Sequence, residues 1–279
     1  HVPVGKHALP ALTKATHPSW WWQCAAMAEV IKFAQVTDSH FISGDKYRTE
    51  VLKSTVESIN KEKGLAFVVF TGDNIDSPKE QYLPEFIKTI NKLDIPYYLV
   101  IGNHDVFKNN GLSKKHYLEI VKENNCFYKY KKPNYVFKKD GFVFVVVDGA
   151  KEVIPGSVGY YKEDTLKWLD KQLTKYSKEP VVIFQHFPLV STKIIPSHEV
   201  YKKKTYLDLL DKHDNVVAIV AGHLHINSEM MRNGVYHITT PTLLNDPNQY
   251  KIITITTTKG FSPMIYTELK NVELLKNED

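Results

Sequence analysis

Residues 67–76 read FVVFTGDNID, an apolar run that ends in a glycine and two carboxylates. Its β-branched and aromatic residues are typical of a strand that is buried on both faces. Gly72 allows a sharp turn where a side chain would obstruct the backbone. Asp73 is therefore expected at the carboxyl end of a core strand, where open α/β sheets place their functional groups. Taken alone, the stretch also fits a strand followed by an ordinary aspartate turn, so the rest of the chain has to decide.

The same order of strand, turn and polar residue recurs along the chain. The stretch quoted above belongs to a predicted strand, Leu65–Thr71. Two further strand candidates end in the same way: Val30–Thr37 before Asp38-Ser39-His40, and Pro96–Ile101 before Gly102-Asn103-His104-Asp105. Two more follow later in the chain: Pro180–Gln185 before His186, and Val216–Ala221 before Gly222-His223-Leu224-His225. Apolar residues at helical spacing predict helices over Lys46–Lys61 and Glu80–Leu93. Strands that alternate with helices in this way predict a parallel sheet with right-handed crossovers.

The middle and the tail of the chain follow a different pattern. Asp140-Gly141 between two apolar runs, Asn134–Lys138 and Phe142–Val147, predicts a hairpin. Helices are expected over Asp164–Leu173 and Thr205–His213. An antiparallel meander is expected in the tail, over Val235–Thr239, Tyr250–Thr257 and Met264–Glu268. The architecture that fits is α/β: two packed, mostly mixed sheets with helices outside and strand ends converging at one rim.

Length and composition limit the kinds of protein that this chain can be. The chain has 279 residues, 43% hydrophobic and 24% charged, which suits one large α/β domain or two small ones. No apolar run approaches the ~18 residues of a membrane-spanning helix, so no membrane partner is expected. Cys24 and Cys126 form neither a disulfide framework nor a CxxC zinc pattern. A reducing, cytoplasmic location is compatible with this cysteine content.

The charge of the chain is only mildly positive. Its formal net charge is +5, from 36 basic and 31 acidic residues, which gives no reason to expect a nucleic-acid partner. Arg48 and Arg232 are the only arginines in the sequence. Because the arginine fork is the usual clamp for phosphate, any phosphate bound here must be held mainly by another group, and a metal ion is the obvious candidate.

Residues 1–26 differ in composition from the rest. They contain three of the four tryptophans and no Asp or Glu, since the first carboxylate is Glu29. We expect this segment to be an expression-derived or fused extension, with residues 27–279 forming a single domain. The alternative is a weak secretory signal, against which Gln23 and the short apolar core argue.

The polar groups at the strand ends form a donor set for metal ions. Asp38 and His40, and likewise His223 and His225, stand at i and i+2, which share one face of an extended segment. Asp73, Asn103 and His186 complete a set of two carboxylates, one amide oxygen and four imidazoles. Such ligands suit Zn, Fe, Mn or Ni rather than Ca. The set is too large for one tetrahedral ion, so we expect two ions, with Asp73 as the bridging ligand.

A pair of metal ions predicts a particular reaction. Two ions about 3.5–4 Å apart clamp an in-line displacement at phosphorus and can provide a hydroxide near neutral pH. The leaving alkoxide needs a proton, which His104 is placed to donate because it follows the ligand Asn103. A histidine in this role is commonly oriented by a carboxylate, for which Asp76 and Asp105 are the two candidates.

Each motif also has a simpler interpretation. A lone His-x-His is more often a surface or core pair than a ligand pair, and a lone Asn-His-Asp carries little information. His186 alone fits a strand-end histidine bound to backbone. The metal hypothesis depends on the agreement of five motifs, each at a predicted strand end of the same chain.

The order of these motifs resembles the calcineurin-like metallophosphoesterase superfamily. The signature blocks are Asp38-x-His40, Gly72-Asp73-x-x-Asp76, Gly102-Asn103-His104-Asp105, His186 and Gly222-His223-x-His225. The resemblance implies a four-layer α/β/β/α sandwich with a dinuclear site of manganese, iron or zinc. It implies that Asp38, His40, Asp73 and His225 bind one ion and that Asp73, Asn103, His186 and His223 bind the other. It also implies that His104 is the proton donor, oriented by Asp76.

Two departures from the family pattern bear on the substrate. Ser77 stands where serine/threonine phosphatases of this superfamily carry arginine, and Asp105 stands where they carry glutamate. Both count against a protein phosphatase. Gly-Asn-His-Asp with Gly-His-Leu-His is similar to bacterial class III cyclic-nucleotide phosphodiesterases, which implies small phosphodiesters or phosphomonoesters as substrates. The alternatives are a nuclease of the same superfamily, or a scaffold that kept the fold without the metals.

Overall fold

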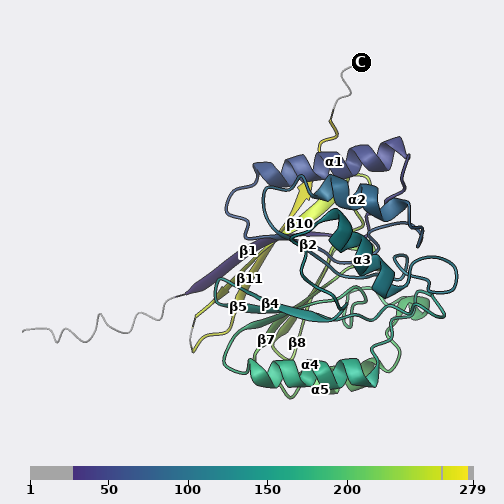
Figure 1. The fold of residues 1–279 in the computed structure, drawn as a ribbon. Helices are drawn as coiled ribbons and strands as arrows, with labels where there is room; N and C mark the ends of the chain where they lie inside the picture. Colours follow the sequence, from purple (N-terminus) through teal and green to yellow (C-terminus); the bar gives the residue numbers. More distant parts are fainter. Residues whose placement is uncertain (1–27, 259, 276–279) are drawn as a thin grey trace, which may run out of the picture.

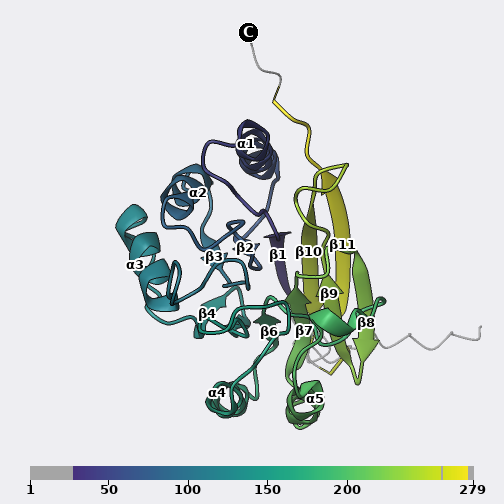
Figure 2. The ribbon, with the colours of Figure 1, turned by 90° about the vertical axis from the view of Figure 1, so that its right-hand side faces the viewer.

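The computed structural model describes residues 28–258 and 260–275, and the prediction for residues 1–26 lies outside this range. In this part of the chain, two mixed sheets pack face to face (Figures 1 and 2). The first runs β11-β10-β1-β2-β3, with bounds Met264–Asn271, Gln249–Thr257, Glu29–Val36, Val68–Phe70 and Tyr97–Leu99. The second runs β4-β5-β6-β7-β9-β8, with bounds Tyr135–Lys139, Phe142–Val146, Val181–Phe184, Val216–Ala221, Val235–Thr239 and Ser228–Arg232.

Helices cover the outer faces of the two sheets. Figure 2 shows α1, α2 and α3 beside the first sheet and α4 and α5 beside the second. Their bounds are Lys46–Lys61, Tyr82–Ile90, Lys114–Asn124, Glu163–Lys175 and Lys203–Leu210. The structure therefore confirms the predicted α/β/β/α sandwich of two mixed sheets flanked by helices. No helix in the described ranges is both long and apolar enough to cross a bilayer.

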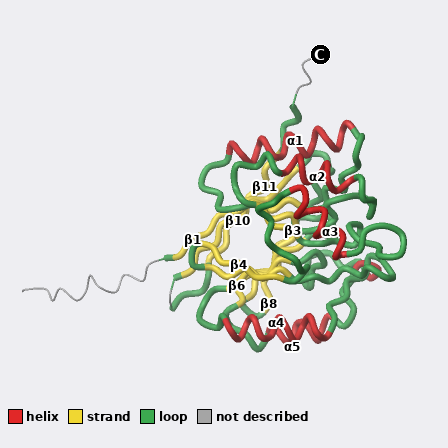
Figure 3. Tube along the Cα trace, in the orientation of Figure 1, coloured by secondary structure: helices red, strands yellow, loops and turns green. Residues whose placement is uncertain are grey.

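Local sequence signals account for most of these elements. The Asp45 side chain accepts a hydrogen bond from the Arg48 amide at 3.0 Å and caps α1, which begins at the predicted residue. The predicted hairpin is present as β4 and β5. Strands β1, β2 and β3 pair in parallel, as do β5, β6, β7 and β9. Parallel strands with helical crossovers send all their carboxyl ends to one rim, where the connecting loops gather (Figure 3).

The three strands predicted in the tail are present, and β10 and β11 pair antiparallel as expected, but the prediction of one continuous meander is wrong. β9 pairs in parallel with β7 in the second sheet, whereas β10 crosses to the first sheet and pairs antiparallel with β1 and β11. β-branched composition indicates a strand, but it does not say which sheet the strand joins. β8 and α3 are present although neither was predicted. β8 lacks β-branched residues, while α3 did carry a signal, since the Ser113 side chain caps it by accepting from the His116 amide.

A cluster of phenylalanines fills the space between the sheets. Phe33 and Phe67 of the first sheet stack with ring centroids 5.0 Å apart. Phe144 of the second sheet lies 5.0 Å from Phe67 and 5.4 Å from Phe184. Aromatic rings in such contacts add to the free energy of burial. This cluster holds the two sheets, and hence their two sets of strand ends, in a fixed relation.

Phe144→Ala should lower the free energy of unfolding by about 3–5 kcal/mol, because it leaves a cavity among fully buried rings. Chemical denaturation of the variant and the wild type measures the difference. Phe127→Ala is the matched control, since Phe127 is 92% exposed and its loss should change the value by less than about 0.5 kcal/mol. Equal effects of the two substitutions would contradict the account of the core.

Candidate metal centre

The seven predicted donor residues all lie just after strands that end at the common rim. Asp38 and His40 follow β1, Asp73 follows β2, and Asn103 follows β3. From the second sheet, His186 follows β6, and His223 and His225 follow β7. Backbone hydrogen bonds continue beyond the strands and hold these segments together: the Asp38 amide donates to the Gly72 carbonyl at 3.0 Å, and the Gly222 amide donates to the His186 carbonyl at 3.0 Å.

Asp38, His40 and His225 form one group of donor atoms. One ligand atom from each lies within 4.8 Å of the other two. His225 Nε2 is 3.2 Å from Asp38 Oδ1 and 3.4 Å from His40 Nε2. Two imidazole nitrogens and a carboxylate oxygen at this spacing match the ligands that transition metals take in proteins.

A second group of donors surrounds Asp73. Asp73, His186 and His223 also offer ligand atoms within 4.8 Å of one another. His186 Nε2 is 3.2 Å from Asp73 Oδ2 and 3.2 Å from Asn103 Oδ1. Asp73 also groups with His40 and His104, so it lies between the two sets of donors. The structure thus brings all seven predicted side chains together at one place.

Five of these seven residues adopt the left-handed backbone conformation. Their φ angles are +51° at Asp38, +40° at His40, +50° at Asp73, +70° at His223 and +54° at His225. A residue with a side chain in this region costs about 1–3 kcal/mol when it is strained, and such residues cluster at functional sites. The turns after β1, β2 and β7 therefore hold the donors in place against a local conformational preference.

Gly72 and Gly222 are among the glycines that leave the space that the donors need. Gly72 has φ +97°, and a Cβ on it would come within 2.5 Å of His186 Nδ1. A Cβ on Gly222 would come within 2.5 Å of Asp38 Oδ2. Real Cβ atoms do not approach other atoms so closely, so a larger residue at either position would displace a donor. The turn predicted at Gly72 is present. A glycine is needed there both for the positive φ angle and because the His186 ring packs against its Cα.

Among the described residues, the buried donor atoms Asp38 Oδ1 and His223 Nε2 make no hydrogen bond of normal geometry. Asp38 Oδ1 has only its ion-pair contact with His225 Nε2, at 3.2 Å. An unpaired buried polar atom costs about 1–3 kcal/mol, so such atoms are rare without a ligand. Neighbouring atoms of the donor side chains are held in place: Thr37 Oγ1 donates to the other Asp38 oxygen, Oδ2, at 2.6 Å, and His186 Nδ1 hydrogen-bonds to the Thr71 carbonyl at 2.8 Å. The free lone pairs and the mixed nitrogen and oxygen donor set fit a transition-metal cation.

The electrostatics of the donors favour a positive charge among them. Burial alone would lower the pKa of His186, but the carboxylate of Asp73 outweighs it and raises that pKa to about 9. Burial and the neighbouring His186 lower the pKa of His223 to about 3, so its imidazole is neutral and able to bind a cation. The Asp73 carboxylate and the His186 imidazole therefore favour a positive charge between Asp73 Oδ2 and His186 Nε2, which either a proton or a metal ion can supply.

The predicted orientation of His104 by a carboxylate is not what the structure shows. His104 Nδ1 lies 2.7 Å from the backbone carbonyl of Asp76, while the Asp76 carboxylate binds Arg48 at 2.7 Å. Asp105 does not contact the ring either. Its buried carboxylate accepts from the Gly102 amide at 2.7 Å and the Ile75 amide at 3.0 Å, and burial with the charge of Asp73 raises its pKa to about 7. Asp105 therefore joins the turns after β2 and β3.

Arg48 is a residue of this site that sequence reasoning missed. From α1, its Nη1 donates both to the Asp76 carboxylate and to the His40 carbonyl. It therefore ties together the turn that carries His40 and the carbonyl that contacts His104. The sequence shows that arginine is rare in this chain, but no motif links Arg48 to its partners. His40 lies eight positions and Asp76 twenty-eight positions away from it in the sequence.

Comparison with known proteins places this site in a family. A family model described as calcineurin-like phosphoesterase matches residues 31–227. An Arcobacter nitrofigilis protein named "Probable glycerophosphodiester phosphodiesterase GpdQ" is 27% identical over 216 residues, covering 74% of this chain and 76% of that protein. A Colwellia psychrerythraea protein named "Probable cyclic nucleotide phosphodiesterase" is 28% identical over 207 residues, covering 70% of this chain and 71% of that protein.

A solved structure agrees with this placement at the level of the fold. The crystal structure of a dimetal phosphatase from Danio rerio has a TM-score of 0.64 and 18% sequence identity, covering 85% of this chain and 98% of that chain. At this identity the likeness shows the fold alone. The match of the family model includes all seven donors, and the phosphodiesterase relatives agree with it. The chain belongs to the calcineurin-like phosphoesterase family and is a metal-dependent phosphoester hydrolase.

Proposed function

We propose that this protein hydrolyses small phosphodiesters at a centre of two metal ions. The observation that carries the proposal is the position of Asp73 between two groups of donors, with Asp38, His40 and His225 on one side and His186 and His223 on the other. Asn103 extends the second group. Asp73 would be shared, and each ion would have both nitrogen and oxygen ligands, as manganese, iron and zinc accept.

The chemistry divides between the ions and the chain. When bound, two such ions neutralise charge on the phosphate and make water acidic enough to react near neutral pH. The chain supplies the proton for the leaving group. Because the Asp76 carbonyl can only accept, the contact at 2.7 Å fixes a proton on His104 Nδ1, and Nε2 carries the second proton when the ring is charged. His104 is exposed, so this proton can reach a bound ester.

The charges near the centre favour a diester over a monoester. Arg48 is engaged by the Asp76 carboxylate and the His40 carbonyl. In the described chain, no arginine or lysine forms an ion pair with a donor carboxylate. A phosphomonoester carries a second negative charge that would need a cationic partner, whereas a diester carries one charge that the metal ions can balance. The names of the curated relatives, which are phosphodiesterases, support the same choice.

Asp73→Ala should lower the turnover of bis(p-nitrophenyl) phosphate by about a thousandfold, because both ions lose a ligand and the transition state loses several kcal/mol. Steady-state assays with added Mn²⁺ measure the change. Asp214→Ala, at an exposed aspartate away from the site, is the control and should keep wild-type turnover. More than a tenth of the wild-type rate in the Asp73 variant would count against a shared ligand.

His104→Ala should lower kcat by about 10²–10⁴-fold for phosphodiesters with alkyl leaving groups, because an alkoxide must be protonated as it departs. The loss should shrink for p-nitrophenolate, which leaves without a proton. His116→Ala is the control, since His116 lies on α3 and pairs with the glutamates Glu80 and Glu119. The same loss with both kinds of leaving group would remove the proton-donor role of His104.

A further inference from the structure

Lys202 holds an unfavourable backbone conformation outside the metal centre. In the part of the chain that the structure describes, eight residues other than glycine have a positive φ angle. Five of them are predicted metal donors, and Asp140 and Asn233 precede the glycines of two hairpin turns, where this conformation is usual. Lys202, with φ +52°, is the remaining one; it precedes α5, and its side chain does not cap that helix. Strained residues of this kind cluster at functional positions.

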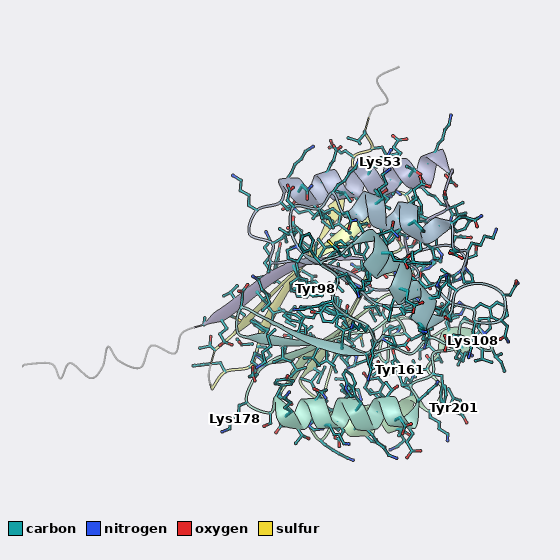
Figure 4. The ribbon with its side chains drawn as sticks, viewed as in Figure 1. Lys53, Tyr98, Lys108, Tyr161, Lys178 and Tyr201 are labelled. Carbon is teal, nitrogen blue, oxygen red and sulfur yellow. The ribbon has the colours of Figure 1, made fainter. Side chains whose placement is uncertain are left out.

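Lys202 lines a cavity of about 340 Å³ whose lining is rich in tyrosine. The Tyr160 and Tyr201 rings contact each other with centroids 5.8 Å apart, and the Tyr161 and Tyr206 rings with centroids 4.8 Å apart. Tyr160 and Tyr201 are exposed, whereas Tyr161 and Tyr206 are buried. Figure 4 labels Tyr201 at the outer edge of the molecule and Tyr161 farther inside. A cavity of this volume with an aromatic lining is typical of a small-molecule site.

The two segments that carry the exposed tyrosines are joined by backbone contacts. The Gly159 amide donates to the Glu199 carbonyl at 3.2 Å, and the Tyr201 amide donates to the Gly159 carbonyl at 2.8 Å. Gly159 and Val200 also form an isolated parallel bridge. These segments are therefore held together before a ligand arrives, which lowers the entropic cost of binding.

The buried tyrosines are anchored on either side of a predicted metal donor. The Tyr161 hydroxyl donates to the Phe187 carbonyl at 3.2 Å, and the Tyr206 hydroxyl donates to Gln185 Oε1 at 2.9 Å. Gln185 and Phe187 directly precede and follow His186. None of the seven donors is among the residues that line the cavity. The cavity is therefore separate from the metal centre, although both are built on this segment.

Lys202 supplies the cavity with a positive charge that has no direct carboxylate partner. It is the first of three consecutive lysines. Lys203 pairs with Glu199, and Lys204 pairs with Asp208 at 2.7 Å. None of the ion pairs between described residues includes Lys202. Of the three lysines, Lys202 is therefore the one whose ammonium group is free to meet a ligand.

The lining favours a ligand that combines a flat ring with a negative charge. Lys202 Nζ lies 5.5 Å from the centroid of the Tyr201 ring, so the charge stands beside an aromatic face. Glu163, the one carboxylate of the lining, binds Lys167 at 2.6 Å and thus already has a cationic partner. An aromatic ring in the cavity would gain contact with the tyrosines, and an anionic group attached to it would gain the Lys202 ammonium group.

We infer that this cavity is a second binding site, for a small molecule in which a flat aromatic ring carries an anionic group. The ring contacts the tyrosines, and the anionic group binds Lys202. Such a ligand would touch the two buried tyrosines whose hydroxyl groups bind the neighbours of His186. The inference goes beyond the proposed function and does not depend on it, because no donor residue takes part.

Three probes separate the contributions of the ring and the charge. Naphthalene-2-sulfonate has both, 2-naphthalenemethanol has the ring without the charge, and methanesulfonate has the charge without the ring. Titration calorimetry of the Mn²⁺-loaded wild type should give a dissociation constant for naphthalene-2-sulfonate about tenfold lower than for either of the others, because it alone uses both the tyrosines and Lys202. Equal affinities for the three probes would overturn the inference.

Two pairs of variants place the probe in the cavity. Tyr201→Ala should weaken the binding of naphthalene-2-sulfonate about tenfold, whereas Tyr266→Ala, at another exposed tyrosine, should not. Lys202→Asn should lower the affinity for the sulfonate to that for 2-naphthalenemethanol, and asparagine accepts the left-handed conformation, so the fold is kept. Lys204→Asn, two positions away, should bind like the wild type. Unchanged binding in both the Tyr201 and the Lys202 variants would overturn the cavity assignment.

Asp73→Ala distinguishes this site from the metal centre. It removes the proposed shared ligand, so it should bind naphthalene-2-sulfonate like the wild type although it loses turnover. Loss of probe binding in this variant would place the probe at the metal centre and contradict the inference. A wild type that binds the probe as expected but does not hydrolyse bis(p-nitrophenyl) phosphate would overturn the proposed function and support this inference.

Discussion

The buried amide of Gln35 joins the ends of strands from both sheets directly below the candidate site. Its Nε2 donates to Thr71 Oγ1 at 2.8 Å, just after β2, and to the Ala221 carbonyl at 2.8 Å, at the end of β7. Its Oε1 accepts from Thr240 Oγ1 at 2.6 Å, just after β9. A fully satisfied buried amide is strongly directional, because any shift of one strand end would leave a buried polar atom unpaired. Together with the phenylalanine cluster between the sheets, this network fixes the strand ends that carry the donors of the two sheets relative to one another.

The candidate metal site itself contains features that lower the stability of the protein without a bound cation. Several donors occupy left-handed turns, and Asp38 Oδ1 and His223 Nε2 are buried without a hydrogen bond of normal geometry to any residue that the structure describes. The His223 amide donates to Asp38 Oδ2 at 3.0 Å, so the two sheets also contact each other through the donors themselves. The left-handed turns and the atoms without hydrogen bonds each cost free energy. Binding of a cation would offset this cost by giving the free atoms a partner. The strain and the unpaired atoms therefore have one common explanation.

The sequence predicted the parts of this structure that short-range patterns determine. The strand ends, α1 and β7 lie where the apolar runs and the turn glycines placed them, because a buried parallel strand and its following turn leave a clear local signal. In the tail, the strands and the β10–β11 pair were predicted, but the joining of β9 to them was not, since β9 and β10 look alike in composition and belong to different sheets. Such long-range pairing depends on which faces remain uncovered after the other elements pack, and no local pattern contains this information.

The candidate site divides in the same way. The seven donors were predicted because each follows a strand, and the rim of a parallel sheet collects whatever follows its strands. The part played by Arg48 and the contact of His104 with a carbonyl rather than a carboxylate were not predictable, since both depend on how α1 and two turns meet in space. The surface beside His104 is also built from loops that are distant in sequence, since the Lys108 amide donates to the Glu152 carbonyl at 2.6 Å.

We propose that Asp73 is shared by two metal ions, and anomalous diffraction from crystals of the Mn²⁺-loaded protein at the manganese absorption edge can locate them. We expect two anomalous peaks about 3.5–4 Å apart, with Asp73 between them and Asp38, His40 and His225 on one side only. A single peak, or two peaks that do not share Asp73, would exclude the shared ligand.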